Sequence, residues 1–214
     1  TAGVSAHSHE CTLLNPADAP LTAAGRPYLV FTPYYNAARR MAVPRPEIAA
    51  PAALGTPPGL PDGLPVSSVA ALTGDPASGA PLQLAERFTP GERGARAALE
   101  RFLADAAAGY ERGRDLPGVA GTSRLSSHLA FGEIAPWRVL EAATVAAERE
   151  PALRPGVESF IRQLYWREFG SHLLHHFPHT ATRPLRPEFD AMPWSDDPDG
   201  LAAWADGRTG FPIV

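Results

Sequence analysis

Apolar residues recur at helical spacing from about residue 89 onward in this 214-residue chain. The first such segment opens with Thr-Pro-Gly-Glu at residues 89–92, which has the pattern of a capping box with Thr89 as the N-cap and proline at the first helical position. We expect this helix to end near Gly109. Its apolar face would be formed by Ala95, Ala98, Leu99, Phe102, Leu103 and Ala106. No strand-rich segment follows residue 40, so the pattern predicts a mainly helical fold.

Further helices are predicted from the same signals. We expect them at residues 31–41 with Thr32 as N-cap, in a short segment that ends at Gly132, in a segment that starts at Pro136, at 156–177, and at 201–204. Ala135, directly before Pro136, would be a poor N-cap. The residues expected to face the core are Tyr34, Tyr35 and Ala38; Leu125 and Leu129; Val139, Ala142, Ala143 and Ala146; and Val157, Phe160, Ile161, Leu164 and Phe169.

Residues 42–88 differ in composition from the rest of the chain. Prolines recur there with glycines between them, and neither a helical nor a strand period is present. Proline lacks the amide donor and keeps the residue before it out of the helical region, so we predict an extended linker along a surface. A disordered tether is the alternative.

Composition and charge exclude several classes of protein. The chain has 19 basic and 23 acidic residues, for a net charge of −4, which argues against a nucleic-acid binder held by bulk charge but leaves room for a local basic groove. Its one cysteine, Cys11, rules out an internal disulfide and a multi-cysteine zinc site and fits a reducing compartment. No segment has the length of a membrane span or the pattern of a signal peptide. We therefore expect a soluble, cytoplasmic protein.

The first candidate for binding chemistry lies between Tyr110 and Ile134. Residues 121–126, Gly-Thr-Ser-Arg-Leu-Ser, form a predicted turn that opens a helix, where hydroxyls and free backbone N–H groups attract anions. This pattern fits a cradle for a phosphate group. The same Ser and Thr side chains would equally serve as ordinary N-caps of their own helix.

A second candidate lies on the longest predicted helix. Gln163, Trp166 and Arg167 are spaced i, i+3 and i+4 and would share one face, where an indole can stack on a flat base while the amide and guanidinium bind its edge. A core tryptophan with two solvated neighbours is the alternative. The histidines that follow, His172, His175, His176 and His179, have helical spacing, but few acidic residues lie nearby and Pro178 breaks the helix, so we expect no metal site.

Residues 110–134, 159–169 and 204–214 together resemble the DNA photolyase and cryptochrome family, and most closely class I-like cyclobutane pyrimidine dimer photolyases. The three motifs stand in the family's order with similar gaps. The resemblance covers residues 89–214 and, more weakly, 11–40. It implies that 89–214 is the N-terminal half of an all-helical FAD-binding catalytic domain, that 42–88 is the interdomain linker, and that 1–41 is the C-terminal remnant of an α/β antenna domain. We accordingly expect the chain to be truncated at both ends and, alone, inactive and unable to hold flavin tightly.

The resemblance also implies which residues bind the cofactor, flavin adenine dinucleotide (FAD). The matching positions are Tyr110, Thr122, Ser123, Arg124, Leu125, Ser126 and Arg167. A fixed guanidinium at Arg167 is chemically reasonable beside an anionic flavin or a phosphate. The full-length protein would also carry an antenna chromophore of the folate or deazaflavin type.

The same resemblance implies that the substrate is damaged DNA with a flipped-out pyrimidine dimer, which a monomeric deoxyribodipyrimidine photo-lyase splits by electron transfer from light-excited, reduced FAD. Trp166 matches the residue that stacks on the dimer, Arg114 one that touches the DNA backbone, and Trp194 the outermost tryptophan of an electron-transfer chain.

Two positions depart from the family pattern. Gln163 stands where many of these photolyases have glutamate, and an amide both donates and accepts hydrogen bonds, which leaves the lesion type open. Phe160 replaces an indole found in some relatives. The alternatives are therefore a (6-4) photolyase, a cryptochrome-type blue-light receptor that binds FAD without repair, and a helical interaction module without cofactor.

Overall fold

The computed structural model describes residues 12–41, 49, 52–53, 88–193 and 195–212, and its regular elements are helices. In chain order the helices are α1 (Phe31–Met41), α4 (Glu92–Arg101), α5 (Tyr110–Gly113), α6 (Ser126–Ala130), α7 (Pro136–Arg149), α8 (Arg154–His176) and α9 (Pro198–Ala205). A π-helical turn (Phe102–Ala106) extends α4, and three 3-10 turns occupy Pro151–Leu153, Pro178–Ala181 and Pro187–Ala191. Within the described ranges the only β-type pairing is an isolated bridge between Leu21 and Pro27. The predicted mainly helical fold is confirmed.

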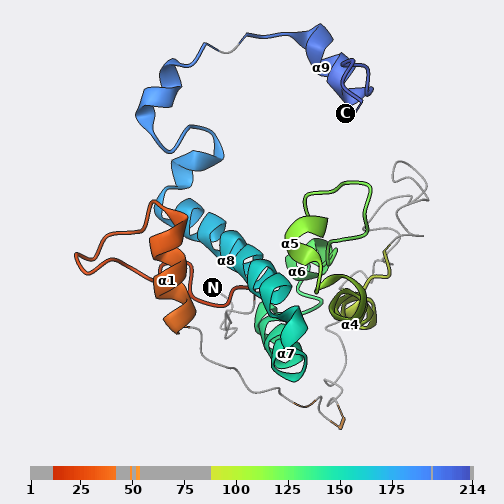
Figure 1. Cartoon of the computed structure of the whole chain (residues 1–214). Helices are drawn as coiled ribbons and strands as arrows, with labels where there is room; N and C mark the ends of the chain where they lie inside the picture. Colours follow the sequence, from red (N-terminus) through yellow and green to blue (C-terminus); the bar gives the residue numbers. More distant parts are fainter. Residues whose placement is uncertain (1–11, 42–48, 50–51, 54–87, 194, 213–214) are drawn as a thin grey trace, which may run out of the picture.

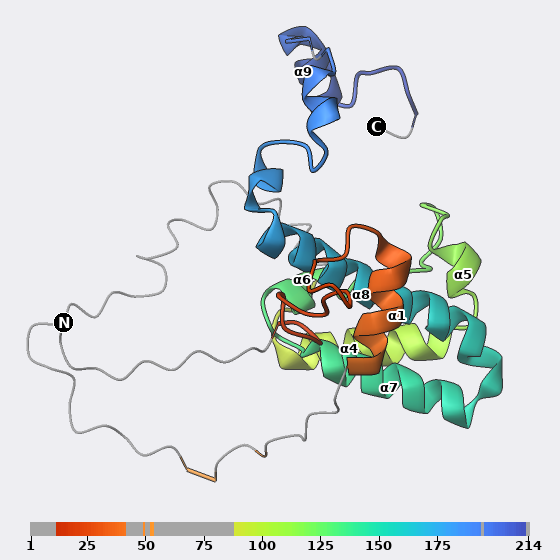
Figure 2. The ribbon, with the colours of Figure 1, turned by 90° about the vertical axis from the view of Figure 1, so that its left-hand side faces the viewer.

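Helix α8 is the central element, and α1, α5 and α7 each pack against it (Figure 1). Helix α1 packs on one side of α8, while α7 and α5 pack elsewhere along its length. Each of these helices contributes to one apolar core, which includes Tyr34 and Ala38, Tyr110, Val139 and Ala143, and Val157, Phe160, Leu164 and Phe169. A view turned by 90° shows α4 and α7 beneath α1 and α8, with α9 away from this body (Figure 2). The apolar faces predicted from periodicity therefore meet along α8.

The predicted capping box at residues 89–92 is wrong. Helix α4 begins at Glu92, its N-cap is Gly91 with φ 89°, and no side chain caps it. The chain before the helix folds back onto its first turn, since a Cβ at Gly94 would lie 1.7 Å from the carbonyl oxygen of Thr89. The backbone of Thr89 thus folds over the helix start, and the positive φ of Gly91 makes this turn possible.

Other helices begin one or two residues away from their predicted starts. Helix α1 begins at Phe31, so Thr32 lies within its first turn and not at the predicted N-cap. Helix α8 begins at Arg154, because a 3-10 turn leads into it and a proline occupies its first turn. Helix α7 begins at Pro136 as predicted, and Ala135 provides no side-chain cap.

Residues 12–28 form a segment without regular secondary structure that is held by polar side chains of α8. The carboxylate of Glu168 accepts hydrogen bonds from the backbone N–H groups of Leu14 and Asn15, at 2.8 and 3.2 Å. One turn further along, His172 accepts from the N–H of Tyr28 at 3.2 Å and its other ring nitrogen lies 3.1 Å from the carbonyl oxygen of Ala17. These contacts anchor the segment across the buried face of α8.

Some predicted features fall outside the described residues, namely Trp194 and almost all of the linker 42–88. The short helix expected at 201–204 is present as α9, where Asp197 caps the N-terminus by accepting a 2.8 Å hydrogen bond from the N–H of Gly200. In the described part of the chain, no helix has both the length and the apolar character to cross a membrane, and no cluster of metal-ligating side chains is found.

Candidate functional site

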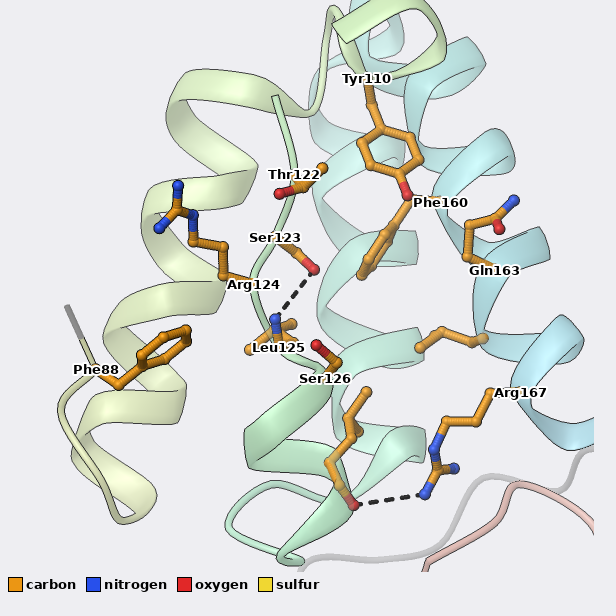
Figure 3. Close-up of a pocket in the computed structure, with 12 residues that line it drawn as sticks. Phe88, Tyr110, Thr122, Ser123, Arg124, Leu125, Ser126, Phe160, Gln163 and Arg167 are labelled. Atoms are coloured by element: carbon orange, nitrogen blue, oxygen red, sulfur yellow. Dashed lines mark hydrogen bonds between the residues drawn. The ribbon is translucent and has the colours of Figure 1, made fainter. Parts of the chain in front are cut away.

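A cavity of about 600 Å³ lies between the segment 122–126, the start of α5 and one face of α8 (Figure 3). All seven residues assigned to the cofactor by resemblance line it, together with Gln163. They are Tyr110, Thr122, Ser123, Arg124, Leu125, Ser126 and Arg167. Phe88, Leu129, Phe160 and Leu164 complete the lining. Residues far apart in the sequence are thus brought to one concave surface of a size typical for ligand sites.

The segment 122–126 has a constrained backbone. Arg124 adopts φ 54°, in the left-handed region that is costly for a residue with a Cβ. Leu125 is 1% exposed and anchors the segment in the core, while its N–H donates to the hydroxyl of Ser123 at 3.4 Å. Burial of Leu125 therefore holds this segment, and with it the neighbouring hydroxyls, in place beside the cavity.

The hydroxyls of this segment are not helix caps. The N-cap of α6 is Leu125, and no side chain caps that helix. Thr122 and Ser126 are exposed, and their hydroxyls form no hydrogen bond to other described residues. The alternative that these residues only satisfy their own helix is therefore wrong, and their hydroxyls remain available to a ligand.

Tyr110 and Phe160 form an aromatic wall of the cavity. Their ring centroids lie 5.6 Å apart in an edge-to-face arrangement, and Phe102 packs against both rings from behind at 5.4 and 4.5 Å. Burial raises the pKa of the Tyr110 hydroxyl above its usual value, so this side chain stays neutral. The wall can pack against a flat apolar ring and exclude water from it.

Arg167 places a fixed positive charge at the cavity. Its Nη1 donates to the carbonyl oxygen of Thr12 at 2.6 Å and lies 3.4 Å from Oε1 of Glu168, while Nη2 donates to the carbonyl oxygen of Leu129 at 3.4 Å. The bond to Leu129 is drawn in Figure 3. Because both arms of the planar guanidinium are held, its position is set before any ligand arrives.

Gln163, Trp166 and Arg167, which were predicted to share one face of α8, do not all lie at the cavity. Gln163 and Arg167 line the cavity, but Trp166 does not. Its indole stacks on Phe31 of α1, with ring centroids 3.8 Å apart and planes inclined by 8°. The prediction of one common face is wrong for Trp166, because α1 supplies a large flat ring on that side of α8. The alternative of a core tryptophan fails too, since 47% of Trp166 is exposed.

Arg114, assigned to the DNA backbone by resemblance, lies just beyond α5 and outside the cavity lining. Its Nε is 3.3 Å from a carboxylate oxygen of Asp115, and its guanidinium carbon lies 5.9 Å from the centroid of the Tyr110 ring. Arg114 is thus exposed beside the aromatic wall.

Several members of the site were not found from the sequence. Phe88 and Leu164 are apolar residues whose positions gave no sign of a ligand, and Leu129 takes part through its backbone oxygen. The stack of Phe31 on Trp166 joins two segments far apart in the chain. None of these contacts has a local sequence signature.

Comparison with known proteins gives a consistent result. Residues 160–214 match the family model described as the FAD binding domain of DNA photolyase. The chain is 36% identical to the deoxyribodipyrimidine photo-lyase of Agrobacterium fabrum, over 99% of this chain and 43% of that protein. It is 37% identical to that of Thermus thermophilus, over 94% of this chain and 41% of that protein, and 35% identical to that of Escherichia coli, over 95% and 42%.

A solved structure shares the fold. The chain matches the crystal structure of a bacterial class III photolyase from Agrobacterium tumefaciens with a TM-score of 0.74 and 34% identity, over 95% of this chain and 41% of the other. The chain spans about two fifths of the length of these three curated relatives.

Proposed function

Because the chain belongs to the DNA photolyase family over the part of its relatives that it spans, we propose that it functions in the blue-light-driven repair of cyclobutane pyrimidine dimers in DNA, as part of a deoxyribodipyrimidine photo-lyase with FAD as cofactor. The reaction splits carbon–carbon bonds without hydrolysis, which makes the enzyme a lyase. The proposal of repair by this protein rests on one observation above all. Seven residues assigned to the cofactor by motif, which lie on three separate segments, line a single cavity.

The lining of the cavity fits one side of a flavin dinucleotide. The free hydroxyls of Thr122 and Ser126 offer donors to phosphate or ribitol oxygens. Arg167 supplies the positive charge that a pyrophosphate or an anionic ring requires. The wall of Tyr110 and Phe160 offers apolar surface to a planar ring. We assign these residues to FAD binding, with Ser123, Arg124 and Leu125 shaping the segment that presents the hydroxyls.

Bound FAD, in its reduced form, would supply a light-driven one-electron reduction of the dimer, with return of the electron after the ring has split. The role of the protein residues is to bind the cofactor and to hold it in a fixed orientation. Arg167, held by two carbonyl oxygens, balances negative charge without needing to move. The neutral Tyr110 and the ring of Phe160 keep water from the apolar side of the cavity. We propose Trp194 as an electron-transfer residue.

We propose that the substrate is DNA with a dimer flipped out of the helix. Trp166, of which 47% is exposed on α8, would stack on one pyrimidine, while the amide of Gln163, which lines the cavity, would bind the hydrogen-bonding edge of that base. Arg114, exposed beside the aromatic wall, would contact a phosphate of the backbone. We further propose a folate- or deazaflavin-type antenna chromophore, and action as a monomer in the cytoplasm.

Light-dependent repair of an oligonucleotide with one thymine dimer tests this proposal, using the full-length gene product and a Trp166→Ala variant. We expect repair by the unmodified protein under blue light and none in the dark, and about a five- to 150-fold loss in the variant, as removal of a stacking platform costs about 1–3 kcal/mol per base. A parallel assay with a (6-4) lesion tests which lesion type the protein with an amide at Gln163 repairs. Bound flavin without repair of either lesion would contradict the proposal and favour a cryptochrome-type receptor. A protein without flavin would favour an interaction module.

A further inference from the structure

Phe31 and Trp166 form the closest parallel ring pair in the described part of the chain. Phe31 is the first residue of α1 and is 5% exposed, whereas Trp166 lies in the middle of α8 and is 47% exposed. Their centroids are 3.8 Å apart and their planes differ by 8°. A buried ring therefore covers one face of a half-exposed indole.

The remaining aromatic contact of Trp166 lies at an edge. The ring of Phe169 meets the indole at 5.9 Å and 71°, and no other ring of the described residues contacts it. Two aromatic neighbours thus fix the plane of the indole through one face and one edge. The opposite face has no aromatic neighbour within the described ranges, and nearly half of the side chain is exposed.

Phe31 is itself held from several sides. Tyr35 stacks near it at 5.7 Å and 18°, and Phe169 meets it edge-on at 5.9 Å. The guanidinium of Arg162, one turn before Trp166 on α8, lies 5.4 Å from the ring centroid of Phe31 and 5.3 Å from that of Tyr35. Phe31 therefore cannot shift without disturbing the packing of α1 on α8, and it provides a rigid base for the indole.

A stacking platform binds best when its plane is fixed before the base arrives, because the side chain then loses little conformational freedom on binding. We propose that Phe31 is a positioning residue for the substrate, which holds Trp166 so that the face opposite Phe31 can stack on one pyrimidine of a flipped-out dimer. This inference rests on the proposed function. It adds α1, which precedes residues 42–88, to the elements that determine lesion binding.

The test compares the affinity of full-length, flavin-loaded protein for a thymine-dimer oligonucleotide and for its undamaged counterpart. Phe31→Leu keeps an apolar side chain of similar size but removes the flat ring. We expect about two- to tenfold weaker binding to the dimer, unchanged binding to undamaged DNA and an unchanged flavin content, which is the effect expected from loss of one aromatic pair. Phe31→Tyr, which retains the ring, should keep at least half of the discrimination.

Two further variants separate positioning from general stability. Val139→Ala removes buried apolar atoms on α7, away from the cavity lining and from Trp166, so it should lower stability but leave the ratio of the two affinities unchanged. In a Trp166→Ala background, Phe31→Leu should have no additional effect on lesion binding. Phe31→Met provides a second ring-free variant if the leucine variant does not fold.

The possible results are distinguishable. If Trp166→Ala weakens lesion binding while both ring-free variants of Phe31 bind the dimer as the unmodified protein does, the positioning role is wrong and the proposed function stands. Additive effects of Phe31→Leu and Trp166→Ala would also contradict positioning. If Trp166→Ala itself binds the dimer normally, the substrate role of Trp166 in the proposed function fails first.

Discussion

The backbone of Gly121 touches that of Gly113, so closely that a Cβ on Gly121 would lie 2.5 Å from both the carbonyl carbon and the carbonyl oxygen of Gly113. Gly113 ends α5, whose first residue, Tyr110, belongs to the cavity wall, and Gly121 directly precedes Thr122. The contact therefore sets the distance between the aromatic wall and the hydroxyls of residues 122–126. It depends on the absence of a side chain, because no real Cβ tolerates such a separation.

We predict that Gly121→Ala destabilises the protein by about 1–3 kcal/mol and lowers its flavin content, since the loop must move away from α5 to accommodate the methyl group. Urea unfolding and the ratio of FAD to purified full-length protein measure the two effects. Gly118→Ala is the matched control, because a Cβ at this position of the same loop meets no atom within 4 Å. Equal behaviour of the two variants would show that the contact does not constrain the loop.

A second pair of glycines lies within α8 and should give effects of opposite sign. A Cβ at Gly156 would lie 1.8 Å from the carbonyl oxygen of Ala107, so Gly156→Ala forces the start of α8 away from the segment before α5 and should cost about 2–4 kcal/mol. At Gly170 nothing lies within 4 Å, and Gly170→Ala should stabilise the helix by up to about 1 kcal/mol. Thermal unfolding of both variants checks the prediction. A stabilised Gly156→Ala protein would contradict the close packing described here.

The sequence predicted those features of the fold that depend on local periodicity. Helix α7 was found because Pro136 marks its start, and α8 because apolar residues recur at helical spacing, although its first two residues were missed. The start of α4 was predicted two residues too early, because Gly91 takes a positive φ and the backbone of Thr89 folds back over Gly94, which the capping pattern does not reveal. The π-helical turn after Arg101 has no sequence signature either.

The candidate site was predicted in part, and mainly through resemblance. Spacing alone left residues 121–126 divided between a phosphate cradle and helix caps, and the structure decides against caps. The spacing also could not show that Trp166 lies apart from Gln163 and Arg167, because the ring that stacks on Trp166 is Phe31, from a distant segment of the chain. The oxygens that hold Arg167 come from the backbone of Thr12 and Leu129, and backbone groups carry no residue-specific signal.

Buried Glu168 should make stability depend on pH. Burial raises the pKa of this carboxyl to about 7, against the opposing effect of its two backbone N–H donors and of Arg167. The folded-state pKa is above the unfolded value of 4.5, so the folded protein binds the proton more tightly. The contribution of Glu168 to stability is therefore complete below pH 4.5 and is lost as the pH rises through about 7.

Glu168→Gln, which does not titrate, isolates this effect. We expect the free energy of unfolding of the unmodified protein, relative to the variant, to fall by on the order of 1–3 kcal/mol between pH 5 and 8, measured by urea unfolding. His172 acts in the opposite direction, since burial lowers its pKa and its contribution is present above pH 6.5 and lost as the pH falls. It is common to both proteins and cancels in the difference. A difference that does not change with pH would mean that the hydrogen bonds from Leu14 and Asn15 keep Glu168 ionised throughout.

Arg167 should affect both flavin retention and the anchoring of residues 12–28. Its two guanidinium arms reach the carbonyl oxygens of Thr12 and Leu129, which a single ammonium group cannot do in the same geometry. We predict that Arg167→Lys weakens FAD binding by the full-length protein about tenfold and that Arg167→Leu weakens it further, because the leucine variant also loses the charge. Fluorescence titration of FAD measures the affinity.

Protease cleavage within residues 12–28 should become faster in both variants, since the bond to Thr12 is weakened or lost. Arg149→Leu, at the end of α7 and outside the cavity lining, removes the same charge and should change neither property. Normal FAD affinity in Arg167→Leu would remove Arg167 from the cofactor site and leave it only the anchoring role.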